Sequence, residues 1–213
     1  MTDAGEGEME RHKSHIEFIV DFLRGEESDD RYLSELDTGI LAAPLNDWAD
    51  PPAYVHNGDA RAELMGGRSR PSTPFGRSST FELLLAYLRS QGVTDPRAEA
   101  ADKRVQADYN ALVQAQPSWL SIDNHPLGAE VLSSTAGLPA EQRTDAIRRA
   151  IEERFRSLDQ TPRWIQSPEW PIVDGRPLIF VGALDISKIR HDVTDLYVFI
   201  DDTGRTVTVE QSM

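Results

Sequence analysis

The stretch from 161 to 213 constrains the fold more than any other part of the chain. It holds two apolar runs, at 178–184 and 196–200, and an alternating run at 206–209. The turn signal Asp-Asp-Thr-Gly at 201–204 separates the last two. Apolar runs between turns predict buried strands, and alternation predicts a strand with one wet face. We therefore expect a sheet core here, with 178–184 as a central strand covered on both faces and a hairpin at the end.

The residues before this stretch show helical periodicity. Apolar residues recur at i, i+3, i+4 and i+7 from Glu10 to Arg24, and Gly25 is a natural stop. Further helices are expected near Tyr32 up to Gly39, from Ser78, Ser79 or Thr80 up to Gly92, from Asp95-Pro96 up to Pro117, and from Pro139 to Leu158. Helices first and strands last predict an α+β fold, in which the helical part 10–158 packs on a twisted, mainly antiparallel sheet.

Three other stretches lack a clear period. Residues 1–9 are rich in glycine and acidic residues and are expected to be a disordered tail. Residues 42–79 hold five prolines and four glycines, and are expected to be irregular, as either a functional lid or a mobile segment. Residues 118–137 are expected to be a loop with a short strand at 119–122. We predict one domain over 10–213.

Composition narrows the classes of protein. The chain has no cysteine, which excludes disulfides, thiolate nucleophiles and Cys-ligated metals. Its formal net charge is -14, and residues 1–50, with 14 acidic and 4 basic residues, hold -10 of it. This balance opposes binding to the phosphate backbone of nucleic acids. No apolar stretch reaches the roughly 18 residues of a membrane span. We therefore expect a cytoplasmic protein that binds neither nucleic acid nor membrane.

No motif of catalysis or cofactor binding is present. The HExxH, G-x-S-x-G and phosphate-loop patterns are all missing. His12 and His15 are three apart, but no third ligand has a matching spacing. Asp174 with Asp185 and Lys188 comes near a nuclease pattern, yet two residues separate the second acid from the lysine, which sends them to opposite faces of a strand. We expect no metal, no cofactor and no catalytic residue, and the sequence leans away from an enzyme.

Several short motifs follow one another in the C-terminal stretch. They are Pro162-Arg163-Trp164, Trp170-Pro171, the run 176–182, Leu184-Asp185-Ile186 and the run 196–201. Their order resembles the core motif of the YwqG-like family, a bacterial domain of unknown function, over about a quarter of the chain. Ala183 stands where the family tends to carry glutamine. The resemblance implies an α+β fold with a twisted antiparallel sheet, no established catalytic residues, and an accessory or toxin-immunity-like role.

The first functional hypothesis is a non-enzymatic protein that binds a basic partner protein through an acidic surface. It rests on the concentration of negative charge in the first fifty residues. An acidic surface that only keeps the protein soluble is the alternative reading. The residues predicted to contact the partner are Glu26, Glu27, Asp29, Asp30, Asp47 and Asp50.

The second hypothesis is an enzyme or small-ligand module with a cleft between the sheet and segment 42–79. Its candidate residues are Asp185, His191, His125, Trp164 and Trp170. Histidines in turns can act as exposed bases, whereas aromatic residues beside strands are more often core, and Asp185 is more often a cap for the following bend. A third possibility is self-association through an exposed apolar helix stripe; the sequence does not determine the oligomeric state.

Overall fold

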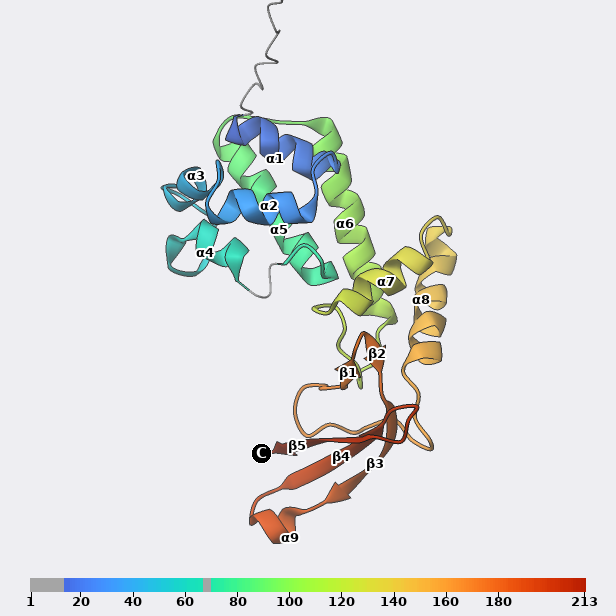
Figure 1. The fold of residues 1–213 in the computed structure, drawn as a ribbon. Coiled ribbons are helices and arrows are strands. Elements are labelled where there is room, and N and C mark those ends of the chain that lie inside the picture. The colour runs from blue at the N-terminus through green and yellow to red at the C-terminus, as the bar shows by residue number, and fades with distance from the viewer. Residues whose placement is uncertain (1–13, 67–69) are drawn as a thin grey trace, which may run out of the picture. The chain divides into compact units, whose positions relative to one another are not determined.

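The computed structural model describes residues 14–66 and 70–213, and Figure 1 shows helices followed by strands. The helices are α1 (His15–Arg24), α2 (Asp29–Asp37), α3 (Ala42–Asn46), η1 (His56–Gly58), α4 (Ala60–Met65), α5 (Pro74–Ser90), α6 (Pro96–Ala115), α7 (Pro126–Ser134), α8 (Ala140–Arg154) and α9 (Ser187–Arg190). The strands are β1 (Ile172–Val173), β2 (Arg176–Pro177), β3 (Ile179–Asp185), β4 (Thr194–Ile200) and β5 (Thr206–Ser212). The predicted α+β class is confirmed. The tail predicted over 1–9 lies outside the described residues.

The described residues divide into two compact units. The first, which we call the helical unit, takes the described part of 1–70 together with Ser79–Arg104. The second, which we call the sheet unit, takes Pro71–Ser78 and Val105–Met213. Helices α5 and α6 contribute residues to both units. The sequence analysis predicted one domain over 10–213 and did not predict this division.

Helix α1 ends at Arg24, as its sequence predicts, but its first residue is His15, after the cap Ser14, and residues 10–13 of the predicted helix lie outside the described part of the chain. Ser14 Oγ accepts a hydrogen bond from the Glu17 amide at 3.2 Å, and Glu17 Oε2 accepts one from the Ser14 amide at 2.9 Å. Gly25 ends the helix with a left-handed φ of 80°. The Phe22 ring stacks on Tyr32 of α2, with centroids 4.2 Å apart. Ile19 and Leu23 of the predicted apolar stripe are buried, whereas Ile16 and Val20 are half-buried. The residues of α1 that are at most 2% exposed are Phe18, Ile19, Phe22 and Leu23.

The acidic run 26–30 precedes the helix predicted near Tyr32, but half of it belongs to that helix. Ser28 Oγ accepts a hydrogen bond from the Arg31 amide at 3.2 Å and so caps α2. Asp29 and Asp30 therefore lie in the first turn of α2, where a carboxylate interacts favourably with the helix dipole. The prediction was wrong because this first turn has no apolar residue that would show a period.

Segment 42–79 is more regular than predicted. Its described residues contain α3, η1, α4 and the start of α5, while 67–69 lie outside the description. Arg61 of α4 donates hydrogen bonds to the carbonyl oxygens of Leu36 at 3.0 Å and Asp37 at 2.6 Å. The segment is thus attached to the end of α2 through helices that are too short for periodicity to reveal.

Helix α5 starts earlier than predicted, whereas α6 starts where the sequence indicates. Thr73 Oγ1 accepts a hydrogen bond at 3.0 Å from the amide three residues further on, so α5 begins before the predicted start at 78–80. Asp95 caps α6, since its Oδ1 accepts a hydrogen bond from the Ala98 amide at 2.8 Å. Asp95 also forms a two-contact ion pair with Arg24 of α1. The hydrogen bond from Arg24 is the main reason that the pKa of Asp95 lies below its usual value.

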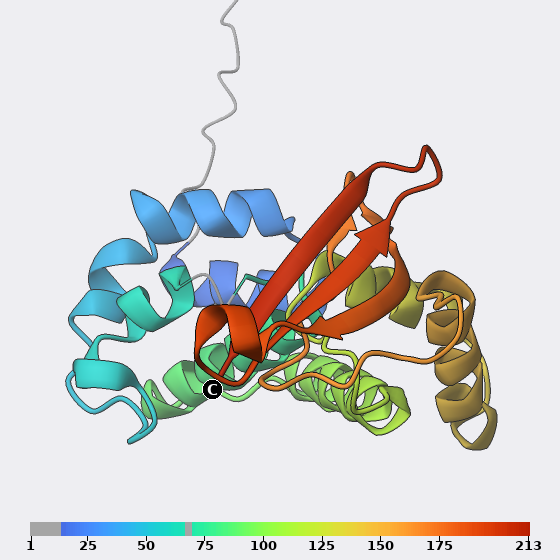
Figure 2. The same cartoon turned by 90° about the horizontal axis from the view of Figure 1, so that it is seen from below.

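The sheet of the sheet unit has three antiparallel strands in the order β3-β4-β5 (Figure 2). The predicted strand at 178–184 exists as β3, but it lies at an edge, and β4 is central. Val181 and Leu184 are accordingly 37% and 58% exposed. The turn at 201–204 joins β4 to β5, which confirms the predicted hairpin. Helix α9 lies at the opposite end of the strands.

The stretch 118–137, predicted as a loop, contains α7. The ring Nδ1 of His125 accepts a hydrogen bond at 3.1 Å from the amide two residues on, and a proline is the first helical residue. Residues 119–122 form no strand. Gly128 lies inside the helix, where it passes close to the carbonyl oxygen of Ile122. Glycine is typical of turns, but here it allows α7 to approach the backbone of Ile122, and the sequence pattern does not show this.

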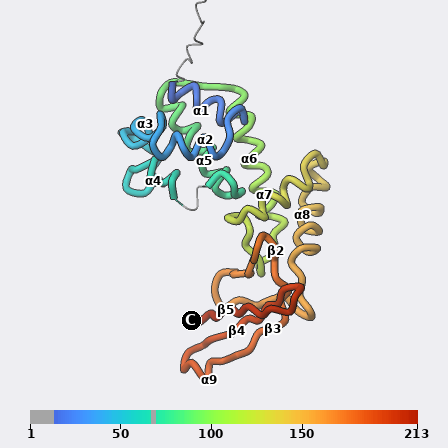
Figure 3. Tube along the Cα trace, in the orientation of Figure 1, coloured from blue at the N-terminus to red at the C-terminus, as the bar shows by residue number. Residues whose placement is uncertain are grey.

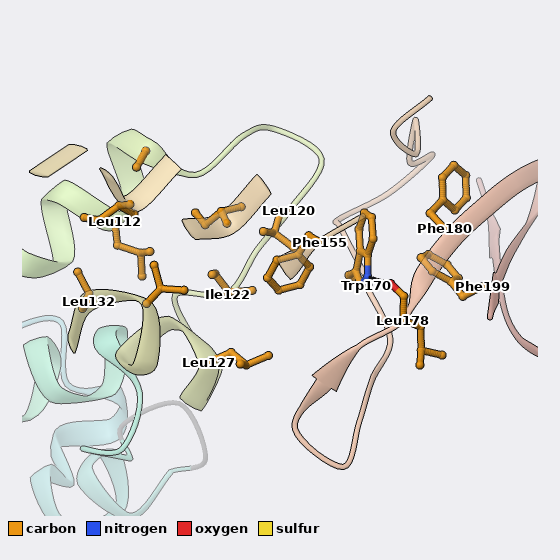
Figure 4. Close-up of a cluster of buried hydrophobic side chains, with 14 of the residues drawn as sticks. Leu112, Leu120, Ile122, Leu127, Leu132, Phe155, Trp170, Leu178, Phe180 and Phe199 are labelled. Atoms are coloured by element: carbon orange, nitrogen blue, oxygen red, sulfur yellow. Dashed lines mark hydrogen bonds between the residues drawn. The ribbon is translucent and has the colours of Figure 1, made fainter. Parts of the chain in front are cut away.

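The core of the sheet unit is built around Trp170. The chain between α8 and β1 is irregular and carries Trp164 and Trp170 (Figure 3). Figure 4 shows the Trp170 indole between Phe155 and Phe199, with ring centroids 5.5 and 5.4 Å away. Its Nε1–H donates a hydrogen bond to the carbonyl oxygen of Leu178 at 2.8 Å. The core includes Leu112, Leu120, Ile122, Leu127, Val131, Ile147, Ile151, Phe180 and Tyr197.

Candidate functional site

A pocket of about 860 Å³ lies within the sheet unit. Helix α7 contributes Leu127 and Glu130 to its lining, and the end of α8 contributes Glu153, Arg154 and Arg156. The other side comes from the β1–β2 and β4–β5 turns and from the strand ends beside them. The volume falls within the roughly 300–1,000 Å³ of pockets that hold small ligands.

Two tight turns give the pocket a defined wall. Asp174 and Gly175 have φ values of 50° and 74°, as the central residues of a type I′ hairpin turn require. In the β4–β5 turn, Asp201 Oδ1 accepts hydrogen bonds from the Thr203 amide at 3.0 Å, the Thr203 hydroxyl at 2.7 Å and the Arg205 amide at 2.8 Å. The Thr203 hydroxyl is the main cause of the lowered pKa of Asp201. The Asp201 carboxylate is thus held in its charged form within the turn.

The pocket is lined by charges of both signs. Its arginines are Arg154, Arg156, Arg176 and Arg205, and its carboxylates are those of Glu130, Glu153, Asp174, Asp201 and Asp202. Two arginines have partners in the lining itself: Arg205 Nε lies 3.1 Å from Asp201, and Arg176 lies 3.7 Å from Asp202. Both side chains of the Arg176–Asp202 pair are exposed to solvent, so this ion pair contributes little to the stability of the fold.

The other two arginines have no acidic partner in the described part of the chain. Arg154 lies in the last turn of α8, where a cation suits the helix dipole, but its Nη1 is buried and has no hydrogen-bond acceptor. Arg156 follows α8 and is exposed. A buried donor without an acceptor costs about 1–3 kcal/mol.

The residues predicted to line a ligand cleft are not brought together. Trp170 belongs to the core of the sheet unit, and Trp164 is partly buried and packs against that core. Asp185 and His191 flank α9, at the end of the sheet away from the pocket, and His125 precedes α7. None of the five lines the pocket. The predicted cleft between the sheet and segment 42–79 would involve both units and stays a prediction.

The three polar residues of that predicted set have local structural roles. Asp185 Oδ1 accepts a hydrogen bond from the Ser187 amide at 2.9 Å, which is the capping role that the sequence favours. The hydrogen bond from the Ser187 side chain is the main cause of the lowered pKa of Asp185. His191 ends α9 with a φ of 61°. His125 caps α7, and burial lowers its pKa, so its ring is a hydrogen-bond acceptor at neutral pH.

The carboxylates predicted to bind a basic partner lie in two groups on the helical unit. One group precedes or begins α2, and the other follows α3. Glu27 lies 3.1 Å from Arg31, and its side chain is only 7% exposed. Asp29 is partly buried. The remaining four are exposed and form no ion pair with a described residue: Glu26, Asp30, Asp47 and Asp50.

Sequence reasoning missed the pocket. Its lining comes from α7, the end of α8 and two hairpin turns, which lie far apart in the sequence. The charged run at 152–156 lies in the helix predicted from Pro139 to Leu158, and charges on a helix are typical of a solvent-exposed face. The Asp-Gly at 174–175 is a strong signal for a hairpin turn. That signal predicts a second hairpin turn, but no spacing links it, or the turn at 201–204, to α8.

Comparison with known proteins identifies no relative. No family model, curated protein or solved structure matches the chain. Within residues 14–66 and 70–213, no three His, Asp or Glu side chains are grouped so that they could hold a metal ion. None of the helices in that same part of the chain has the length and apolar character needed to cross a bilayer.

Proposed function

We propose that this chain is a non-enzymatic binding protein that takes a small polar ligand in the pocket of the sheet unit. The observation that carries the proposal is the lining of this pocket, in which Arg154 and Arg156 make no ion pair with a described residue. The lining includes no histidine, and its one hydroxyl side chain, that of Thr203, donates to Asp201. Such a lining supplies charge and apolar contact but no nucleophile paired with a base.

The proposal predicts that a bound ligand shifts the backbone amides of the pocket and leaves distant ones unchanged. In an NMR titration with inorganic phosphate, acetate and trialanine, at least one probe should shift Gly175 and Thr203 but not His191 at the far end of the sheet. Ile179→Trp should fill the pocket and weaken that probe at least about tenfold. Val181→Trp, on the same strand but outside the lining, is the matched control and should bind as before.

Binding of a basic partner protein, which the sequence favours, is the second candidate. Glu26, Asp30, Asp47 and Asp50 support it because they are exposed and form no ion pair with a described residue. An accessory or immunity-like role, as the resemblance to the YwqG-like family implies, would fit such a surface. This candidate uses the helical unit alone.

Neutralising these four carboxylates tests the second candidate. We expect Glu26→Gln, Asp30→Asn, Asp47→Asn and Asp50→Asn together to weaken binding of an octa-arginine peptide by about tenfold at about 50 mM salt, and by much less at about 500 mM, because salt screens exposed charges. Fluorescence anisotropy measures the affinity. The control makes the same change in net charge on the sheet unit, at exposed residues: Glu141→Gln, Glu152→Gln, Asp159→Asn and Glu169→Gln. Equal losses in both variants would show that only net charge matters and would exclude a defined surface.

A further inference from the structure

Unpaired charges of both signs line the same pocket. Arg154 and Arg156 come from the end of α8, Glu153 comes from the same helix, and Glu130 comes from α7. None of these four side chains makes an ion pair with a described residue. Asp174, at the β1–β2 turn, is a third unpaired carboxylate. A neutral ligand, or one with a single charge, would leave one of the two sets without a counter-charge.

The local geometry explains why the two sets do not neutralise each other. Glu153 and Arg154 are consecutive in α8, and consecutive helical residues point in different directions. Glu130 lies on α7, which packs against α8, yet no arginine nitrogen of the described residues comes within 4.0 Å of its carboxylate. The charges are therefore near one another but separate. A ligand between them can meet both.

We propose that the ligand of this pocket is zwitterionic, with a short peptide bearing free ends as its class. The inference rests on the proposed function, because it names what the pocket binds. The carboxylate of the ligand faces Arg154 and Arg156, whose planar guanidinium groups suit a carboxylate. Its ammonium group faces Glu130 and Glu153.

The lining also offers apolar surface to the body of such a peptide. Its apolar members include Leu127, Val173, Pro177, Ile179 and Ile200. An extended peptide spans at most about 3.3–3.6 Å per residue, so peptides of two to four residues offer end-to-end separations of roughly 7–14 Å. Dialanine, trialanine and tetra-alanine therefore offer their two charged ends at three different separations.

Three forms of one peptide test the inference. Trialanine is compared with its N-acetyl form, which lacks the ammonium group, and with its C-terminal amide, which lacks the carboxylate. We expect trialanine to bind at least about tenfold more tightly than either blocked form. With Arg154→Gln and Arg156→Gln together, trialanine and its amide should bind alike. With Glu130→Gln and Glu153→Gln together, trialanine and its N-acetyl form should bind alike.

Matched variants separate a binding role from a structural one. Arg148→Gln with Arg149→Gln removes two exposed arginines of the same helix outside the lining, and should keep the full discrimination among the three forms. Arg156→Gln alone changes an exposed side chain, so it serves if the double variant does not fold. Thermal unfolding identifies a folding defect. For the single variant, a partial loss of the preference for the free carboxylate is expected.

The outcomes distinguish this inference from the proposed function. If all three forms bind equally and shift the amides of Gly175 and Thr203, the pocket binds ligands but the zwitterionic class is wrong. Tighter binding of the amide than of trialanine would indicate a cationic ligand and would also overturn the inference. If no alanine peptide shifts these amides, the inference fails. The proposed function fails with it only if phosphate and acetate leave them unshifted too.

Discussion

Replacing Trp170 with alanine is expected to lower the free energy of unfolding by about 3–5 kcal/mol. The side chain is only 8% exposed, and its ring contacts those of Trp119, Phe155 and Phe199. Its loss would leave a cavity at the junction of helix, loop and strand side chains. It would also leave the buried carbonyl oxygen of Leu178 without its donor. Urea unfolding followed by circular dichroism measures the change.

Trp170→Phe is the matched variant, since it keeps an aromatic ring but removes the indole N–H. We expect it to lower the free energy of unfolding by about 1–3 kcal/mol, the cost of an unsatisfied buried acceptor. The sequence also admitted Trp170 as a ligand residue. Suppose that Trp170→Ala lowered the free energy of unfolding by less than about 1 kcal/mol and yet abolished ligand binding. Trp170 would then be a ligand-binding residue, and its assignment to the core would be wrong.

Gly128→Ala is expected to lower the free energy of unfolding by about 1–3 kcal/mol. A Cβ at this position would overlap the carbonyl oxygen of Ile122 and would lie 3.0 Å from Pro74 Cγ and 3.2 Å from Leu112 Cδ2. The first obstacle is backbone, which cannot turn aside as a side chain can. The higher helix propensity of alanine, worth about 1 kcal/mol in a helix interior, offsets only part of this cost. Because α7 supplies Leu127 to the pocket, ligand binding should weaken as well.

Gly182→Ala is the control for Gly128→Ala. A Cβ at Gly182 would meet nothing within 4 Å, and the residue lies in the edge strand β3. We expect its substitution to change the free energy of unfolding by no more than about 0.5 kcal/mol. Chemical denaturation of both variants under one set of conditions makes the comparison. A Gly128→Ala protein as stable as the Gly182→Ala protein would contradict the close approach of α7 to the Ile122 carbonyl.

Local signals in the sequence predicted the parts of the fold that depend on neighbouring residues. Gly25 ends α1, Asp95 begins α6, and the turn at 201–204 closes the β4–β5 hairpin, because caps and turns involve residues only a few positions apart. The same kind of signal existed for α7, in which a proline follows the capping His125. Gly128, a residue type that favours turns, opposes this helix signal in the sequence.

Non-local pairing explains the errors in the sheet. The apolar run at 178–184 predicted a strand correctly, but its composition does not say whether another strand lies on each side. β3 has β4 on one side and only a single bridge, from Ser157 to Phe180, on the other. Val181 and Leu184 are consequently exposed although they are apolar. Strand order depends on which segments pair in the folded sheet, and the hydrophobicity of one segment does not indicate its neighbours.

The candidate sites show the same division between local and distant contacts. The Glu27–Arg31 ion pair has i, i+4 spacing and could have been predicted, which would have removed Glu27 from the acidic surface. The Arg205–Asp201 pair is also local. The unpaired state of Arg154 is different, because it depends on α7 and on two turns that no spacing connects to α8.

The pocket of the sheet unit is the feature on which the proposed function depends most. The most direct test is the NMR titration of the unmodified chain and of Ile179→Trp with trialanine, inorganic phosphate and acetate. We expect at least one probe to shift the amides of Gly175 and Thr203 while His191 stays unchanged, and we expect Ile179→Trp to weaken that probe at least about tenfold. If none of the probes shifts these amides, or if Ile179→Trp binds as tightly as the unmodified chain, the pocket is not the binding site.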